Sequence, residues 1–322
     1  MLNMRNRCLY CYRDLQAGEK DFHPQCSKAF FGTPEPPVLG YSLDQMTELA
    51  AQVVERSVTV PGVQPKLSLT LVKDALADGR NNRLTIVGAL GGNYMLKPPN
   101  PDYPEMPANE HLTMRMAEAF GLRVVLSSLI RLSSGELSYI TKRIDRTANG
   151  AKIHMLDMFQ VLEAVDKYKS SMERVGKAIA KYAENTLLDL SYLFELTVFS
   201  FLTGNNDMHL KNFSMLRQPG GTWDMAPAYD LLNVSIVNPD DEEELALPIA
   251  GRKKKLDRAR FQTFGEGLGL NDRQINGVFN RMAKHQGLAK EMISRSFLTK
   301  ERQEAYNLLL SDRYSRLDMI HR

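Results

Sequence analysis

Apolar and polar residues alternate along five stretches in the first half of the chain, as they do in half-buried β-strands. The stretches are 58–72, 83–88, 93–97, 122–132 and 137–144. Two helices are predicted around them. One starts after Ser42, whose hydroxyl can cap it, and the other covers 107–121, from Pro107 to the stop at Gly121. The region 60–144 is therefore predicted to be a β-rich lobe with one prominent helix.

From Ile153 onward the apolar residues recur at helical spacing. Helices are predicted over 155–165, 172–183 and 187–203, and several more from Leu256 to the end. A polar loop that continues as a hairpin over 213–230 interrupts them, and so does the acidic run NPDDEEE. We divide the chain into an N-terminal element and linker at 1–40, a small lobe at 41–145 and a helical lobe at 146–322.

Composition does not determine the fold, but it bears on the partners and the cellular location of the protein. The chain has 322 residues, of which 43% are apolar, and a formal net charge of +3 from 41 basic and 38 acidic side chains, which does not require a nucleic-acid partner. The longest apolar stretch contains Asp189 and Glu195, so no membrane span is expected. No apolar segment follows Arg5 and Arg7 as in a secretion signal, and three cysteines make no disulfide framework. A cytoplasmic protein is expected.

The loop GNNDMHLKNF gathers four chemically active side chains directly after an apolar helix. Asp207 and Asn212 have the spacing of the Asp and Asn in the catalytic loop of protein kinases, where the Asp accepts the substrate proton and the Asn holds Mg²⁺. Lys211 would add positive charge near the transferred phosphate, and His209 would brace the loop or the metal ligands. The alternative is a polar turn that caps the preceding helix.

Three further residues occur in the order that a kinase requires. Asp230 follows the loop and the hairpin, where a kinase places its main Mg²⁺-binding Asp; the alternative is an N-cap of a following helix. Lys97 ends a strand and Glu110 lies on the next helix, like the pair that positions ATP phosphates; the alternative is an exposed Lys at a sheet edge.

A phosphate-covering loop is expected before the first strand. That segment has one glycine, Gly62, and does not match the G-x-G-x-x-G pattern. Contacts to phosphate would then come from side chains, namely Ser57, Thr59, Gln64 and Lys66. Together these signals favour an ATP- and Mg²⁺-dependent phosphotransferase with a bilobal, protein-kinase-like α+β fold.

Five segments, PGVQPKLSL, MLKPPNPDYPEMPANEH, ITKRIDR, GNNDMHLKNFS and MAPAYDLLN, resemble the HipA family of serine/threonine kinase toxins, and most closely its short form, HipT. The resemblance implies that Asp207 is the catalytic base, that Asn212 and Asp230 ligate Mg²⁺ and that Lys97 holds ATP phosphates. It also implies an adenine-contacting hinge around Tyr139, Ile140 and Lys142, and autophosphorylation at Ser57 and Thr59.

The same resemblance implies partners. Characterised members phosphorylate an aminoacyl-tRNA synthetase and are the toxin of a toxin–antitoxin pair with HipB, a DNA-binding antitoxin. In the short form the N-terminal subdomain is a separate small protein, HipS. Neither direct nucleic-acid binding nor membrane attachment is expected for this chain.

The N-terminal element contains all three cysteines, and with one histidine they form the pattern C-x2-C-x11-H-x2-C at Cys8, Cys11, His23 and Cys26. Two close pairs of soft or borderline ligands suit a closed, tetrahedral, structural Zn²⁺ site. The alternative is three reduced thiols and a surface histidine. A role in clamping the chain's start onto the small lobe and a role in docking a partner both remain open.

Two charged runs have less specific interpretations. GRKKKLDRAR can contact an acidic partner or tRNA, but a solvated loop is favoured, and a solvated loop is also expected for DDEEE.

Two rival functions stay open. A small-molecule phosphotransferase predicts turnover of a metabolite, and a catalytically silent zinc-containing binding module predicts no dependence on Asp207.

Overall fold

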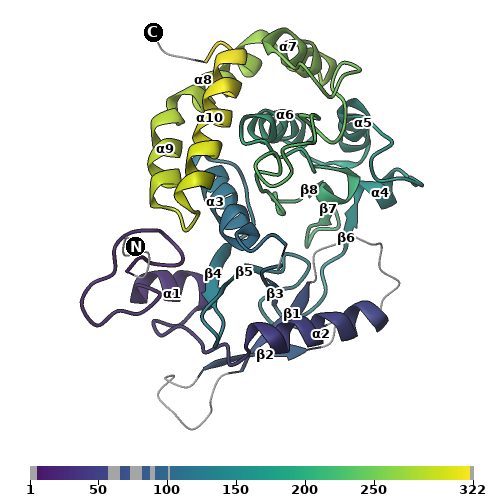
Figure 1. Cartoon of the computed structure of the whole chain (residues 1–322). Helices are drawn as coiled ribbons and strands as arrows, with labels where there is room; N and C mark the ends of the chain where they lie inside the picture. Colours follow the sequence, from purple (N-terminus) through teal and green to yellow (C-terminus); the bar gives the residue numbers. More distant parts are fainter. Residues whose placement is uncertain (1–5, 57–65, 73–81, 88–90, 101, 320–322) are drawn as a thin grey trace. The chain divides into compact units, whose positions relative to one another are not determined.

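The computed structural model of the chain describes residues 6–56, 66–72, 82–87, 91–100 and 102–319 (Figure 1). The chain forms two compact units. Unit 1 consists of Met1–His111, Val125–Lys152 and Arg295–Phe297, and unit 2 consists of Leu112–Val124, Ile153–Ser294 and Leu298–Arg322.

Unit 1 is built on a five-stranded antiparallel sheet, as the alternating pattern predicts. Its strands are β1 (Leu67–Val72), β2 (Arg83–Val87), β3 (Tyr94–Lys97), β4 (Ser127–Arg131) and β5 (Leu137–Lys142), in the order β2-β1-β3-β5-β4. The short strand β3 is central, with Leu96 opposite Ile140 and Lys97 opposite Tyr139. Because side chains alternate between faces, this register places Lys97 and Tyr139 on one face and Leu96 and Ile140 on the other.

The helices of unit 1 are α1 (Pro24–Phe31), α2 (Leu43–Arg56) and the start of α3 (Met106–Ala119). Helix α1 begins at a proline and ends at Gly32, whose φ of 84° is the left-handed cap conformation. Helix α2 begins as predicted, because the Ser42 hydroxyl accepts from the Gln45 amide and the Gln45 side chain accepts from the Ser42 amide. Both α1 and α2 contribute to the core cluster that includes Leu96 and Ile140.

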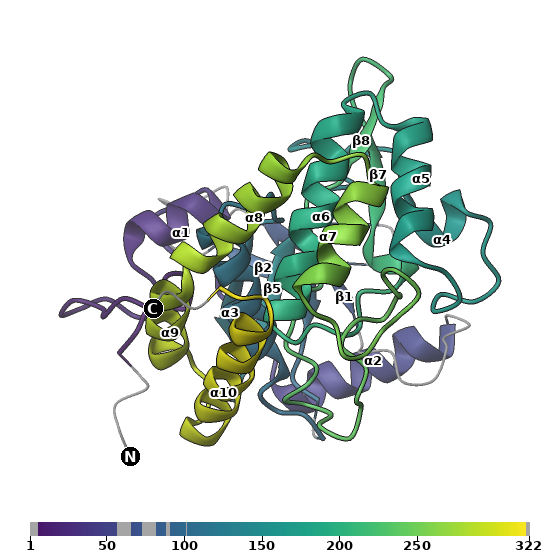
Figure 2. The same ribbon diagram turned by 90° about the horizontal axis from the view of Figure 1, so that it is seen from above.

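Unit 2 is organised around α6 (Thr186–Leu202), which is apolar on nearly all sides and largely buried, as expected of a helix in the middle of a lobe. It contacts α5 (Met172–Tyr182), α7 (Arg258–Gly267), α8 (Asp272–Lys284) and α10 (Lys300–Arg316), and Figure 2 shows α5, α6 and α7 next to one another. Helix α9 (Gln286–Arg295) follows α8. Within the described residues, no helix combines the length and apolarity needed to cross a membrane.

The helix predicted over 155–165 is largely wrong. Residues Met155–Asp157 form the strand β6, which pairs with β7 (Ser214–Arg217) in a small sheet completed by β8 (Trp223–Met225). Only the single turn α4 (Met158–Val161) is helical, and a capping box between Asp157 and Gln160 starts it. Tertiary pairing with β7 therefore overrides the apolar spacing. The hairpin predicted after the polar loop is confirmed as β7 and β8.

The acidic and basic runs are largely exposed loops, as the sequence predicts, but they also pair with each other, which the sequence analysis did not predict. Lys253 contacts Glu243 at 3.0 Å and Lys254 contacts Glu242 at 3.0 Å. Glu244, only 9% exposed, accepts from Arg316 of α10 at 2.6 and 3.0 Å and from the Leu256 amide at 2.8 Å. Although burial opposes it, the Arg316 guanidinium lowers the pKa of Glu244 below its usual value.

We predict that Glu244→Gln lowers the free energy of unfolding by about 3 kcal/mol, because it removes the counter-charge of the partly buried Arg316 and of the buried Arg313, which lies 3.2 Å from Glu244. Folding lowers the pKa of Glu244. The stabilisation is therefore fully present at a pH above the pKa of Glu244 in the unfolded chain, and it is lost as the pH falls through the lower pKa of the folded chain. Urea unfolding at pH 7 and in steps toward pH 4 measures it, and the gap between variant and parent should narrow in acid.

The matched control is Glu242→Gln, whose ion pair with Lys254 is exposed. Its cost should stay within about 0.5 kcal/mol. Equal effects of the two substitutions would contradict a structural role specific to Glu244.

Candidate active site

The polar loop after α6 is fixed at its start by Gly204. Its φ is 68°, and a Cβ there would lie 2.7 Å from the amide oxygen of Asn233. The Gly204 carbonyl accepts from the amides of Val234 and Ser235 at 3.0 and 3.1 Å. A side chain would break this close approach, so glycine is required here. The loop is therefore attached to the segment after Asp230 as well as to the end of α6.

Asp207 and Asn212 are joined within the loop. The Asn212 side-chain amide donates to the backbone carbonyl of Asp207 at 2.9 Å, across the short 3₁₀ turn η1 (Leu210–Asn212). The NH₂ group of Asn212 is thus committed to the loop, and its amide oxygen is the atom that can serve a hard cation. An Asn side chain that bonds a nearby backbone carbonyl also occurs in ordinary polar turns, so the alternative of a capping turn stays open.

Two residues that the sequence analysis missed contact the loop from the segment between α4 and α5. The Tyr168 hydroxyl donates to Oδ1 of Asp207 at 2.8 Å, and Lys167 Nζ lies 2.9 Å from Nε2 of His209. Both residues lie about 40 positions upstream, and no spacing rule links them to the loop. Burial and the charge of Asp207 raise the pKa of the Tyr168 hydroxyl, which stays a donor at neutral pH.

His209 is held as a neutral imidazole. An ammonium group can only donate, so Nε2 of His209 accepts from Lys167 and the ring proton lies on Nδ1. Burial lowers the pKa of His209, the charge of Asp207 opposes this, and Lys167 adds to it. The carboxylate of Asp230 also acts on His209, so both acids of the candidate site lie in its surroundings.

Asp230 does not cap a helix, and that alternative is wrong, because 231–238 contains no helix. Its φ is 61°, a left-handed conformation that a non-glycine residue adopts at a cost and that gathers at functional sites. The preceding Tyr229 hydroxyl contacts the Ser214 hydroxyl at 2.5 Å and donates to the Lys211 carbonyl at 3.0 Å. These contacts tie Tyr229, the residue before Asp230, to the end of the loop. The Lys211 ammonium lies over the Phe159 ring, 4.9 Å from its centroid.

Unit 1 contains a second set of predicted residues. Lys97 and Glu110 form an ion pair at 2.6 Å and are 4% and 1% exposed, and Lys97 lies 5.5 Å from the centroid of the Tyr139 ring. The alternative of an exposed Lys at a sheet edge is wrong, since β3 is the central strand.

The predicted hinge residues divide between the two faces of the sheet. Tyr139 shares the face of Lys97, whereas Ile140 and Lys142 lie on the other, where the Lys142 ammonium is 5.7 Å from the centroid of the Phe30 ring of α1. Burial lowers the pKa of Lys142. Lys66 precedes β1 and is exposed, and Ser57, Thr59 and Gln64 lie outside the described residues. The adenine contacts predicted for Tyr139, Ile140 and Lys142, the phosphate contacts predicted for Gln64 and Lys66, and autophosphorylation at Ser57 and Thr59 stay predictions.

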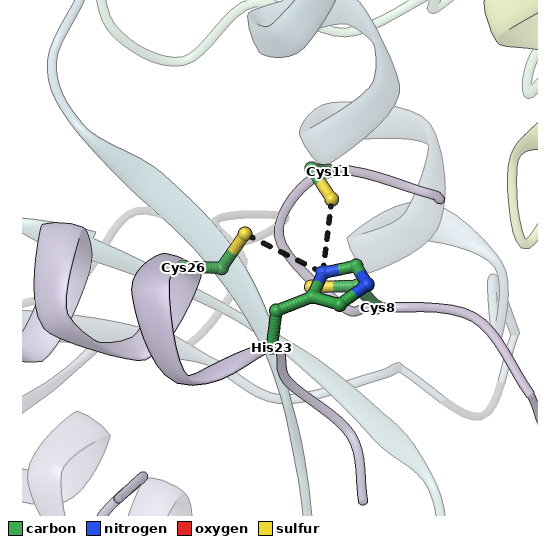
Figure 3. Close-up of side chains that lie close together, drawn as sticks. All are labelled: Cys8, Cys11, His23 and Cys26. Atoms are coloured by element: carbon green, nitrogen blue, oxygen red, sulfur yellow. Dashed lines mark hydrogen bonds between the residues drawn. The ribbon is translucent and has the colours of Figure 1, made fainter. Parts of the chain in front are cut away.

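The four N-terminal ligands converge, as Figure 3 shows. Their ligand atoms all lie within 4.8 Å of one another, and His23 Nδ1 is 3.5 Å from Sγ of Cys11 and 3.6 Å from Sγ of Cys26. Ligand atoms around one Zn²⁺ ion lie about 3.3–3.8 Å apart, given bonds of about 2.0–2.3 Å. The group therefore fits a closed zinc site, and the prediction that these four residues come together is confirmed.

The surroundings of His23 suit a metal ligand. Its Nε2 lies 3.0 Å from the backbone carbonyl of Asp14, to which it donates, so Nδ1 carries the lone pair that points at the three sulfurs. A ligating histidine ordinarily has such a partner on its other nitrogen. The sequence pattern gives the ligands but not this second contact, because any backbone carbonyl can supply it.

Comparison with known proteins places these features in a family. The profile of the family described as HipA-like C-terminal domain matches residues 58–289. A Haemophilus influenzae protein whose name classes it provisionally as a kinase is 28% identical over 292 residues, which cover 81% of this chain and 82% of that protein. The serine/threonine-protein kinase toxin HipA of Shewanella oneidensis is 25% identical over 250 residues, 70% of this chain but only 55% of the toxin.

A solved structure supports the same fold. The complex of Shewanella oneidensis HipA with HipB and its operator DNA contains a chain with a TM-score of 0.68 and 22% identity, over 84% of this chain and 70% of that one. The predicted α+β, bilobal, kinase-like fold is thereby confirmed. Since the profile also spans most of the sequence, this chain belongs to the HipA-like C-terminal domain family.

Proposed function

We propose that this protein is an ATP-dependent serine/threonine protein kinase that acts as the toxin of a toxin–antitoxin pair. The observation that carries the proposal is the loop of unit 2, in which Asp207, Asn212 and Asp230 are assembled around a neutral His209. Relatives named as kinases, one of them a serine/threonine kinase toxin, support it. The finer assignment to the short HipT form rests on the sequence resemblance alone.

Asp207 is proposed to accept the proton of the substrate hydroxyl. Its Oδ1 accepts from the Tyr168 hydroxyl, so a substrate Ser or Thr hydroxyl takes over the same acceptor position. Lys167 fixes His209 and so keeps the loop in place for this exchange. Lys211 is proposed to add positive charge for the transferred phosphate.

Asn212, through its amide oxygen, and Asp230, through its carboxylate, are proposed to hold Mg²⁺. Two oxygen ligands from protein are what this ion ordinarily takes beside substrate phosphates, and when bound it neutralises charge on the transferred phosphate. Lys97, held in place by Glu110, is proposed to bind ATP phosphates, with Gln64 and Lys66 near the phosphates and Tyr139, on the same face as Lys97, near the adenine. The side chains of Ile140 and Lys142 lie on the other face of the sheet, so no adenine contact is proposed for those side chains.

Autophosphorylation is proposed at Ser57 or Thr59, in the segment before β1. A phosphate there would add up to about two negative charges beside ATP, a direct route to self-inhibition. The proposed protein substrate is a translation component such as an aminoacyl-tRNA synthetase.

The proposed partners are a HipB-like DNA-binding antitoxin and a HipS-like small protein. Support for the first is that Shewanella HipA has been solved with HipB and operator DNA. We also propose that Zn²⁺ is a structural component of this protein, held by Cys8, Cys11, His23 and Cys26, and takes no part in phosphoryl transfer.

We predict that Asp207→Asn lowers phosphate transfer from γ-labelled ATP by at least about 100-fold, because the variant keeps the loop's shape but lacks the base. The assay measures label on Ser57, Thr59 and added aminoacyl-tRNA synthetases, with mass spectrometry of the starting material to detect prior phosphorylation. The matched control, Asp224→Asn, changes an acid of β8 that accepts from Asn185 and should retain activity.

Transfer to a metabolite and to no protein would favour a small-molecule phosphotransferase. Equal activity of the parent and Asp207→Asn would contradict the assignment of the base. ATP binding without any transfer by unphosphorylated protein would favour a silent binding module.

We further predict that Glu110→Gln destabilises the protein by about 3 kcal/mol, because it removes the carboxylate charge that compensates the buried Lys97 ammonium. The double variant Lys97→Met, Glu110→Leu should recover most of that loss, since two apolar side chains of similar volume replace the pair. It should nevertheless fail to use ATP. Urea unfolding and the labelling assay on the same preparations separate the two effects.

Glu118→Gln on the same helix removes an exposed partner of Arg115 and serves as the control, with a change within about 0.5 kcal/mol. A double variant that is stable and fully active would show that the pair does not serve ATP.

A further inference from the structure

The turn that carries Cys8 and Cys11 belongs to the core of unit 1 and does not form a module of its own. Cys8 and Leu9 are fully buried in the same cluster as Leu96, and the carbonyl of Leu9 accepts from the amide of Leu129 in β4 at 3.2 Å. Arg131 of β4 contacts Asp21 at 2.9 Å. Of the two roles left open by the sequence, these contacts favour clamping the chain's start onto the sheet over docking a partner.

Tyr12 connects this turn to helix α3. Its backbone amide donates to the carbonyl of Cys8 at 3.0 Å, and its φ of 63° closes the turn that brings Cys11 back toward Cys8. Its hydroxyl lies 2.8 Å from Nδ1 of His111, and the two rings meet edge to face with centroids 5.2 Å apart. Tyr12 and His111 are 3% and 0% exposed, so this hydrogen bond is shielded from water.

His111 directly follows Glu110, the partner of Lys97. A contact that fixes His111 therefore also fixes the turn of α3 from which Glu110 reaches β3. The position of Tyr12 depends in turn on the fold of the Cys8–Cys11 turn, which a metal ion holds closed when four ligands bind it. The structure thus links the metal ligands to the ion pair through the contact between Tyr12 and His111.

We propose that Tyr12 is a positioning residue for the Lys97–Glu110 pair, and that Zn²⁺ bound by Cys8, Cys11, His23 and Cys26 maintains that position. The consequence for ATP use rests on the proposed kinase function. The structural part of the proposal, a zinc-dependent start of α3, does not.

The test uses the full chain. Elemental analysis by mass spectrometry measures zinc per chain in protein purified without chelator, and about one zinc is expected. Hydrogen exchange of the peptides that cover α3 and β3 is then compared in three samples: the zinc-loaded parent, the parent stripped of zinc by a chelator under reducing conditions, and zinc-loaded Tyr12→Phe. The matched control is Tyr41→Phe, another tyrosine of unit 1 packed against the same core.

Tyr12→Phe should keep its zinc, because it removes no ligand. The amides in the first turns of α3 should exchange about fivefold faster than in the parent, from the ordinary worth of one hydrogen bond. Zinc removal should change the same peptides in the same direction, by at least as much, and Tyr41→Phe should change none of them. If the kinase is active, Tyr12→Phe should raise KM for ATP more than it lowers kcat for a protein substrate.

Protein with substantially less than one zinc per chain would overturn the proposal, and so would unchanged exchange in α3 for Tyr12→Phe. If zinc removal unfolds the whole chain, the hydrogen exchange of zinc-loaded Tyr12→Phe decides whether Tyr12 positions α3, because this variant leaves the metal in place. A zinc-dependent α3 in a protein without kinase activity would support this inference while the proposed function failed, so the two failures can be told apart.

Discussion

The buried ion pair between Lys97 and Glu110 is the interaction on which the arrangement of unit 1 depends. Both charges are almost fully removed from water, which costs several kcal/mol for each ion unless close contacts compensate. The placement of the two side chains offsets this cost of removing their charges from water. Lys97 lies on the central strand over the Tyr139 ring, and Glu110 projects from α3 to meet it at 2.6 Å. Any movement of β3 against α3 lengthens this contact, so the sheet register and the start of the helix must be fixed together.

In unit 1 close polar contacts hold a buried pair of charges. In unit 2, by contrast, apolar packing supports a polar loop in a strained conformation. Asp230 and Gly204 both have positive φ, and for a residue other than glycine such a conformation costs on the order of 1–3 kcal/mol. The acidic run shares in holding the loop. The Asn206 side chain donates to Asp241 and to the carbonyl of Glu243, next to the buried contacts of Glu244 with α10. The acidic run thus braces Asn206, the residue before Asp207.

Local patterns were sufficient to predict the elements whose cause is local. The alternating strands of unit 1, the Ser42 cap of α2 and the apolar helix α6 follow from spacing and capping alone. Met155–Asp157 was wrongly predicted as helix because its partner in β7 lies about 60 residues away, and a helical spacing carries no information about that pairing. The pairing of Lys253 with Glu243 escaped for a related reason, since each charged run by itself is typical of a solvated loop.

In the candidate site, too, the features set by local sequence could be predicted and those set by distant residues could not. The spacing of Asp207 and Asn212 and the N-terminal cysteine–histidine cluster can be identified from sequence because each set forms a compact pattern. Lys167, Tyr168 and Tyr12 cannot, because each contacts a residue far away in the chain: His209, Asp207 and His111, respectively.

The small size of the N-terminal element explains why its fold is coupled to that of unit 1. About 30 residues cannot bury enough apolar surface to fold alone. The structure places Cys8, Leu9 and Phe30 in the core of the sheet rather than in a core of their own. An element that shares the core of unit 1 transmits its own order to that unit, so a metal ion that orders the element acts on the sheet and on α3 as well.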